Sequence, residues 1–144
     1  VAATKAAMEE GIVPGGGMAL FYAGAELRAH KSAANDILVA ASEAPIRMIL
    51  ENSGQNADEI IKQLVARRPA GGGLSWQGYD AAKQAISDLK AAGIVDPLKV
   101  VKTALMNAVS VAANYLTIGA AVTEIPKKES SGGAPPMPGM GGEF

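Results

Sequence analysis

The sequence predicts a mainly α-helical fold, a helical bundle with a few short β-strands. Four stretches carry apolar residues at helical spacing, namely 18–29, 32–52, 57–67 and 97–118. Only two segments are short and extended in character, 12–14 and 121–125. Aromatic residues make up only 4% of the chain, so its core has to be built mainly from alanine, valine, leucine and isoleucine.

Bulk composition limits the classes of function. A length of 144 residues fits one domain, and a net charge of -1 offers no field to attract nucleic acid or an acidic membrane. The absence of cysteine excludes a disulfide framework, and a single histidine, His30, argues against a histidine metal centre. Charged residues are only 19%, against about 25% in typical domains. We therefore expect some apolar surface to be buried against chain or subunits beyond these residues.

Three of the helices predicted in the first half of the chain carry specific sequence signals. Residues 1–10 read as the last turns of a helix that ends at Gly11, with no N-cap, which predicts that the sequence was cut from something longer. Pro45 lies inside the helix predicted over 32–52 and should bend it or remove a hydrogen bond. Asn56 is the expected N-cap of the next helix.

The second half of the chain begins with a segment that has no clear helical pattern and ends with a long predicted helix. Residues 70–79 are glycine-rich and predict a loop or small hairpin, and 81–91 predicts a modest helix. The long helix over 97–118 raises the question of a membrane span. Lys102 and two asparagines interrupt its apolar run, so a buried central helix is favoured.

A triple glycine, Gly15, Gly16 and Gly17, stands between a short extended segment and a helix. Free amides at a helix N-terminus attract anions, and glycine lets a ligand approach the backbone closely. The segment lacks the lysine and hydroxyl of a phosphate loop and is not a dinucleotide fingerprint. A tight turn with close helix packing is the structural alternative.

Two aspartates have a similar double interpretation. Asp96 precedes Pro97 and is placed to cap the long helix, with Pro97 at its first position. Its carboxylate could instead accept hydrogen bonds from ribose hydroxyls, and it cannot serve both roles fully. Asp80 is most simply the cap of the helix predicted over 81–91, although the backbone at this turn could reach the edge of a base.

Several segments taken together resemble the group I (GroEL-type) chaperonins. Residues 4–20 (TKAAMEEGIVPGGGMAL) are similar to the stretch in which a long helix ends and a glycine turn begins. Residues 43–47 (EAPIR), 78–82 (GYDAA) and 93–100 (GIVDPLKV) match the family's Glu-Ala-Pro-Leu-Arg, Gly-Tyr-Asn-Ala-Ala and Gly-Ile-Leu-Asp-Pro-Thr-Lys-Val. The matches run in order through essentially the whole chain, and their combination is specific.

This resemblance implies the C-terminal part of an equatorial ATPase domain over 1–125, followed by a flexible Gly/Pro/Met-rich tail over 126–144. Members of the family form seven-membered rings, usually stacked in pairs. They use ATP, with Mg²⁺, to enclose non-native polypeptides under a co-chaperonin lid and assist their folding. The strand predicted over 121–125 resembles one that pairs with a neighbouring subunit.

The resemblance also implies a set of nucleotide-binding residues. Gly16 would touch the nucleotide, the adenine edge would meet Asp80, Ala81 and Ala82, Ile94 would pack on the base, and Asp96 would hold the ribose hydroxyls. Asp80 departs from the asparagine common in bacterial members. Either side chain offers an acceptor oxygen to the adenine amino group, so binding should survive.

The catalytic parts of the family's site fall outside these matches. The resemblance places the catalytic aspartate just upstream of Val1, and the phosphate loop and the magnesium-binding aspartate in an N-terminal half. It therefore implies no catalytic residue and no metal ligand in this chain. The chain alone is expected not to hydrolyse ATP and to bind it weakly at best.

Two other classes of function stay open. A helical interaction module without nucleotide function would use the apolar faces to bind partners, and predicts that Gly16, Ile94 and Asp96 lie apart. A nucleotide-binding enzyme domain built on the glycine turn predicts several alternating strands and helices. A chaperonin predicts that the three residues converge.

We expect this protein to be located in a bacterial cytoplasm, with an organelle matrix as the alternative. We expect neither nucleic acid nor a membrane as a partner.

Overall fold

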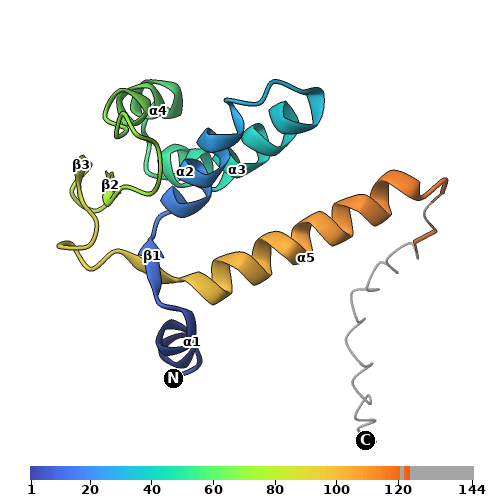
Figure 1. Cartoon of the computed structure of the whole chain (residues 1–144), viewed down its shortest axis with the longest axis horizontal. Helices are drawn as coiled ribbons and strands as arrows, with labels where there is room; N and C mark the ends of the chain where they lie inside the picture. The colour runs from blue at the N-terminus through green and yellow to red at the C-terminus, as the bar shows by residue number, and fades with distance from the viewer. Residues whose placement is uncertain (121, 124–144) are drawn as a thin grey trace, which may run out of the picture.

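The computed structural model describes residues 1–120 and 122–123 of the chain, and within them the fold is mainly helical (Figure 1). Helices and strands follow one another in the order α1 (Ala2–Glu10), β1 (Ile12–Pro14), α2 (Met18–Leu27), α3 (Ala33–Asn52), α4 (Ala57–Ala66), β2 (Gln77–Asp80), β3 (Ala85–Asp88), β4 (Val95–Pro97) and α5 (Leu98–Thr117). The predicted fold class is confirmed. The predicted strand over 121–125 and the tail over 126–144 lie outside the described residues, apart from 122 and 123.

The strands form two small antiparallel pairs. Strand β1 pairs with β4, more than eighty residues further along the chain, and β2 pairs with β3 in a hairpin. The helix predicted over 81–91 is wrong, because residues 81–84 form the hairpin turn and 85–88 the second strand. Helix propensity is a weak preference, and in the structure Tyr79 of β2 and Leu89, directly after β3, are both buried in the core.

Two predicted helix boundaries, at Gly11 and Asn56, are confirmed, and Ser32 provides a further cap that was not predicted. Gly11 ends α1 with φ 86°, a conformation that favours glycine. Asn56 caps α4, since its side-chain oxygen accepts hydrogen bonds from the amides of Asp58 (3.1 Å) and Glu59 (3.3 Å). Ser32 caps α3 in the same way through the amide of Asn35 (3.1 Å).

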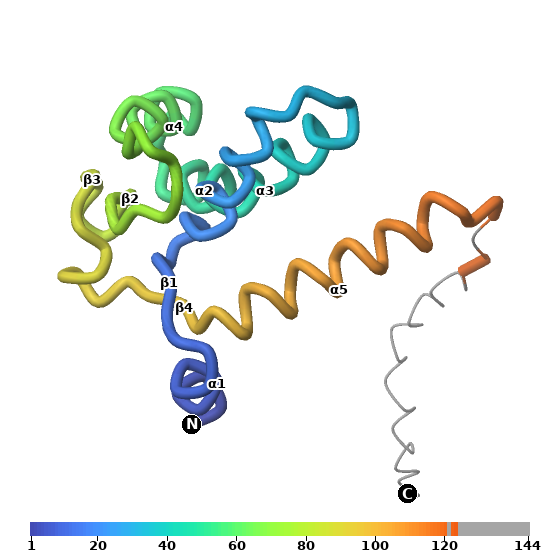
Figure 2. Tube along the Cα trace, viewed as in Figure 1, coloured from blue at the N-terminus to red at the C-terminus, as the bar shows by residue number. Residues whose placement is uncertain are grey.

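The core lies where α2, α3, α4 and the β2–β3 hairpin meet (Figure 2). Helices α2 and α3 approach closely at Gly24, where a Cβ would lie 2.7 Å from the Cβ of Ser42. The buried side chains that this arrangement brings together are Met18, Phe21, Tyr22, Ile46, Leu50, Ala57, Ile61, Leu64, Tyr79 and Leu89. The core is therefore aliphatic with three aromatic rings, in line with the composition.

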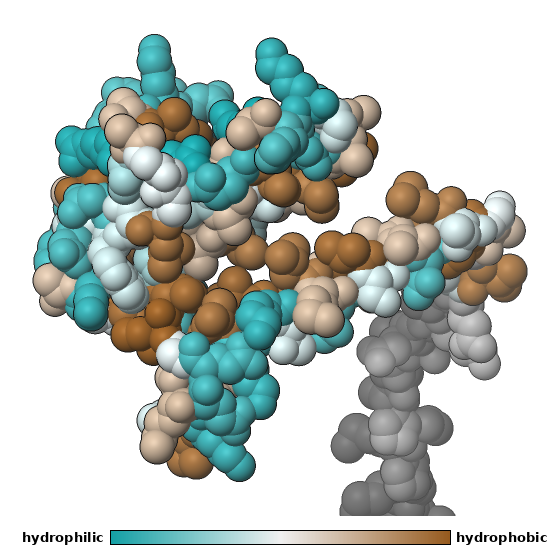
Figure 3. Space-filling model, viewed as in Figure 1, coloured by the Kyte–Doolittle hydropathy of each residue, from teal (hydrophilic) through white to brown (hydrophobic). Residues whose placement is uncertain are grey.

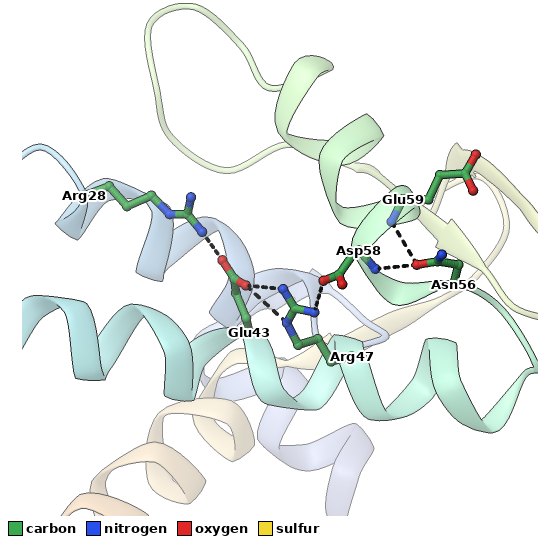
Figure 4. Close-up of polar contacts among 6 residues, drawn as sticks. All are labelled: Arg28, Glu43, Arg47, Asn56, Asp58 and Glu59. Carbon is green, nitrogen blue, oxygen red and sulfur yellow. Dashed lines mark hydrogen bonds and ion pairs between the residues drawn. The ribbon is translucent and has the colours of Figure 1, made fainter.

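An ion network ties the three helices of the core together (Figure 4). The buried carboxylate of Glu43 on α3 accepts from Arg28, at the end of α2, and from Arg47 on α3 itself (3.3 Å). Arg47 also reaches Asp58 in the first turn of α4 (2.6 Å). Because both arginines stay partly exposed, only the carboxylate is removed from water, and it has two cationic partners.

Helix α5 projects away from this core (Figures 1 and 2). It begins beside α1 and β4, and none of its residues is buried within the described part of the chain. The expectation of a buried central helix is therefore wrong for these residues by themselves. Hydrophobic side chains run along much of its length (Figure 3), including Leu105, Met106, Val109 and Leu116. No helix in the described residues is long and apolar enough to cross a membrane.

Candidate nucleotide-binding site

The β1–β4 pair brings the glycine turn to the segment before the long helix. Val13 lies opposite Asp96 in this ladder, and Pro14 lies opposite Val95. Directly beyond the ladder, the amide of Gly15 donates to the carbonyl oxygen of Ile94 (3.0 Å). Segments almost eighty residues apart in the sequence are thus fixed side by side through their backbones.

The three glycines of the turn have different surroundings. A Cβ on Gly15 would lie 3.1–3.2 Å from atoms of Ile94, and one on Gly17 would lie 2.8 Å from the Ile46 amide nitrogen. These two positions have the close packing that the structural alternative predicted. Gly16 is different, because a Cβ there would meet only the Tyr79 carbonyl oxygen, at 4.0 Å, although its φ of 64° still favours glycine. Among the three glycines, Gly16 is therefore the one with free space where a side chain would lie.

The hairpin turn after β2 lies beside Gly16. Strand β2 packs tightly on the start of α2, since a Cβ on Gly78 would lie 2.8 Å from Met18 Cγ and would also overlap Leu89. The Tyr22 hydroxyl fixes the strand further by donating to the Gln77 carbonyl oxygen (2.7 Å), and burial raises the pKa of that hydroxyl. This packing holds the Tyr79 carbonyl, and the turn that follows it, next to the glycine turn.

Asp80 is buried at the first position of that turn, with 3% of its surface exposed. Its Oδ1 accepts hydrogen bonds from the amides of Ala82 (3.0 Å) and Lys83 (3.2 Å). The Lys83 ammonium lies 3.6 Å from Oδ2. The expected cap exists, but it closes a hairpin turn and not a helix. Ala81 packs against the core, and Ala82 is exposed.

Ile94 bonds to Gly15, Asp96 lies opposite Val13, and both residues are half-buried. Ile94 packs against the edge of the core. The expected capping role of Asp96 is wrong, because Pro97 occupies the N-cap position and the amide of Leu98, the first residue of α5, donates to the Gly11 carbonyl (3.1 Å). Strand pairing satisfies this amide, so the Asp96 carboxylate is not needed there.

The structure places Gly16 beside the Tyr79 carbonyl, which directly precedes Asp80, and Gly15 beside Ile94, whereas Asp96 lies opposite Val13 in the ladder. They do not line the groove of about 510 Å³ that runs between α1 and α5. That groove is lined mainly by small and apolar residues, namely Ala2, Ala3, Ala6, Lys99, Val100, Thr103, Ala104 and Asn107. The candidate site is therefore one wall, and this chain supplies no opposite wall within its described residues.

Val1 marks the point before which the resemblance places the catalytic aspartate. It occupies the N-cap position of α1, its side chain is fully exposed, and it makes no capping hydrogen bond. An apolar, exposed valine offers no group for acid–base or nucleophilic chemistry, so Val1 itself is not part of the candidate site. The position of the catalytic aspartate upstream of Val1 stays a prediction, because the described residues begin at Val1.

Sequence reasoning missed the backbone connections of this wall. It gave no sign that the residues before the long helix pair with β1, or that the Tyr79 carbonyl faces Gly16. The β-branched residues Ile94 and Val95 directly before Asp96 and Pro97 were the available signal for a short strand.

Comparison with known proteins shows the family of the chain. The sequence profile of the TCP-1/cpn60 chaperonin family matches residues 1–126. The mitochondrial chaperonin CPN60-2 of Zea mays is 44% identical over 146 aligned positions, which cover 97% of this chain and 24% of that protein. The chain therefore spans about a quarter of the length of this curated relative. The open-state monomer of a group II chaperonin from Methanococcoides burtonii superimposes with a TM-score of 0.64 over 74% of this chain and 28% of its own, at 19% identity, which is a likeness of fold.

The family match over most of the chain defines the class of protein, a region of a chaperonin. The chain belongs to the TCP-1/cpn60 chaperonin family. Its identity with the mitochondrial CPN60-2 identifies it more narrowly as a group I chaperonin region.

Proposed function

We propose that this chain forms the base-and-ribose wall of the ATP site of a group I chaperonin, a protein that encloses non-native polypeptides and assists their folding. Gly16 would approach the nucleoside through its open side. The turn at Asp80, Ala81 and Ala82 would meet the adenine edge. Ile94 would pack on the base, and Asp96 would accept hydrogen bonds from the ribose hydroxyls.

One observation carries the proposal: three segments distant in sequence converge on Gly16. The Gly15 amide bonds to Ile94, and the Tyr79 carbonyl faces the open side of Gly16. An interaction module without nucleotide function predicts that these segments lie apart. An enzyme domain built on the glycine turn predicts several alternating strands and helices, whereas the sheets in the described residues are two antiparallel pairs.

The remainder of the site would come from other parts of a longer protein, including the segment upstream of Val1. The phosphate contacts, the Mg²⁺ ligands and the residue that activates the attacking water have no candidates in the wall described above. The apolar side chains of α5 are exposed, and a groove lies between α5 and α1. Both features support the proposal that other parts of a longer protein cover this surface. Assembly into seven-membered rings, a co-chaperonin lid and a location in an organelle matrix or a bacterial cytoplasm belong to the same proposal, and the relative from Zea mays is mitochondrial.

A calorimetric titration of the full-length protein with ATP tests this assignment. Asp96→Ala should weaken ATP binding about tenfold or more, because a charge-assisted hydrogen bond contributes about 1.5–3 kcal/mol. Asp36→Ala, which removes an exposed carboxylate from the first turn of α3, is the matched control and should leave the affinity unchanged. Unchanged affinity in Asp96→Ala would contradict the ribose contact. ATP turnover by the isolated 144-residue chain, abolished by Asp96→Ala, would contradict the division of the site between chain segments.

A further inference from the structure

We infer that Glu43 is a positioning residue of the candidate site: its buried carboxylate, held by Arg28 and Arg47, fixes α2 against α3 and thereby fixes the glycine turn that carries Gly16. This inference rests on the proposed function, because Gly16 belongs to the wall assigned there. It also gives a role to the segment 43–47, which the sequence singles out and the proposed function leaves without one.

The first argument is the contact between the glycine turn and α3. Gly17 is the N-cap residue of α2 and directly follows Gly16. A Cβ on Gly17 would lie 2.8 Å from the Ile46 amide nitrogen and 3.2 Å from the Pro45 carbonyl carbon. The backbone of α3 therefore limits the position of the turn, because closely packed interiors transmit small shifts to their neighbours.

The second argument is the close approach of the two helices further along. Gly24 lies seven residues after Gly17, on the same face of α2, and a Cβ there would lie 2.7 Å from the Cβ of Ser42 on α3. Apolar burial is non-directional and does not by itself prevent two helices from sliding or rotating against each other. Directional polar contacts are therefore needed to fix α2 on α3.

The third argument is that the Glu43 carboxylate supplies these contacts. Arg28 and Arg47 approach it from opposite sides (Figure 4). Arg28 is the C-cap residue of α2, so this ion pair joins the end of α2 to α3, while Gly17 contacts α3 at the start of α2. The Glu43 side chain is only 10% exposed, and charge-assisted hydrogen bonds to such a carboxylate are strong and geometrically specific.

Glu43→Gln in the full-length protein tests the inference. Glutamine keeps the size of the side chain and one acceptor oxygen but removes the charge that faces both arginines. In a calorimetric titration, ATP binding should weaken about fivefold, an effect typical of residues that act on a site through an intervening segment. Asp58→Ala is the matched control from the same ion network. Its side chain is 84% exposed and contacts only Arg47 there, so the affinity should stay unchanged.

Two substitutions of Arg28 test the link between the helices without removing the buried carboxylate. Arg28→Ala leaves Glu43 with Arg47 alone and should weaken ATP binding about threefold. Arg28→Lys keeps a cation on the same side chain length scale and should restore the wild-type affinity. About half of the Arg28 side chain is exposed, so both variants should fold.

Amide hydrogen exchange separates positioning from a general loss of stability. The Met18 amide donates to the Gly15 carbonyl oxygen (3.2 Å) and reports on the glycine turn. The Leu89 amide donates to the Trp76 carbonyl oxygen (2.8 Å) and reports on the hairpin. Glu43→Gln should accelerate exchange at Met18 and leave the exchange at Leu89 unchanged.

The outcomes are distinct. Unchanged ATP affinity in Glu43→Gln would overturn the inference, and so would an equal loss of affinity in Asp58→Ala. Equal acceleration of exchange at Met18 and Leu89 would show a merely structural role and would overturn it as well. If Glu43→Gln does not fold, the Arg28 pair decides, since equal affinities of Arg28→Ala and Arg28→Lys would contradict the role of the ion pair. Failure of the proposed function is recognised separately, by a wild-type protein that does not bind ATP or by unchanged affinity in Asp96→Ala.

Discussion

Helices α3 and α5 each contain twenty residues, and both carry apolar side chains along most of their length, yet only α3 buries any of them within the described chain. Helix α3 buries Ile46 and Leu50 completely and is held by α2, α4 and the ion network around Glu43. Helix α5 buries no residue within the described chain and contacts α1 and β4 near its beginning. Apolar content alone therefore does not decide which helix is buried. A helix is buried where the chain supplies a partner surface.

Matched leucine substitutions in α3 and α5 should give the largest difference in stability. In the 144-residue chain, Leu50→Ala should lower the free energy of unfolding by about 2–5 kcal/mol, because Leu50 is fully buried. Leu105→Ala on α5, where the leucine is 40% exposed, should lower it by about 0.5 kcal/mol or less. Urea denaturation followed by circular dichroism measures both. Equal losses would contradict the described difference between the helices.

The same pair of substitutions sharpens the comparison in the full-length protein. If other chain segments cover α5 there, as we propose, Leu105→Ala should lower the midpoint of thermal unfolding by a shift similar to that of Leu50→Ala. A full-length protein that tolerates Leu105→Ala without any shift would argue against a covered α5.

Gly17 and Gly54 test the close contact between the glycine turn and α3. Their φ angles are 78° and 75°, but a Cβ on Gly17 would lie 2.8 Å from the Ile46 amide nitrogen, whereas nothing lies within 4 Å of one on Gly54. Gly17→Ala should therefore destabilise the chain by about 3 kcal/mol, through steric overlap as well as backbone strain. Gly54→Ala should destabilise it by about 1 kcal/mol, through strain alone. Similar losses of stability in both variants would show that α3 shifts at Ile46 to make room for the new methyl group, and would contradict a rigid contact.

The turn residue Gln84 should respond in the opposite direction. Gln84→Gly removes the strain of φ 52° and should stabilise the chain by about 0.5 kcal/mol after the greater backbone entropy of glycine is included. Lys83→Gly is the control, because Lys83 has no positive φ, and it should destabilise. Denaturant midpoints measure both variants, and a destabilised Gln84→Gly would contradict the strain at this turn.

Glu26 should give the smallest and most local effect, which depends on pH. The pKa of its carboxyl is lowered from the ordinary value of 4.5, first by the hydrogen bond from the Gly73 amide and then by Arg68. Since the folded pKa is depressed, the contact contributes fully above about pH 4.5 and is lost as the pH falls through the lowered folded value. The amide resonance of Gly73 should follow this transition. Glu26→Gln should abolish it, and a Gly73 resonance that titrates unchanged in that variant would contradict the contact.

Sequence reasoning succeeded where a feature depends on a few neighbouring residues. Asn56 and Gly11 were predicted at the ends of helices because caps follow from local hydrogen bonding and glycine conformation. The fold class followed from periodicity. These features are set within one or two turns of chain, so no knowledge of distant segments was required.

The predictions failed where contacts with a distant segment of the chain determine the local structure. Residues 81–91 were predicted to be helical, but residues 85–88 pair with β2 as a strand, and the flanking Tyr79 and Leu89 are buried in the core. Asp96 follows every local rule for a helix cap, yet pairing of β4 with β1 satisfies the first amide of α5 through Gly11. The residues of the candidate site came from a family resemblance. The pairing of β1 with β4, which sets Gly15 beside Ile94, could not be predicted from local patterns, because it joins residues about eighty positions apart.

The most direct test is a structure of the full-length protein with a non-hydrolysable ATP analogue and Mg²⁺. The proposed wall predicts that the ribose hydroxyls lie within hydrogen-bonding distance of the Asp96 carboxylate, about 3.5 Å or less, with the base against Ile94 and the backbone of Ala82. A nucleotide bound elsewhere, or one that leaves Gly16 and Asp96 facing solvent, would contradict the account.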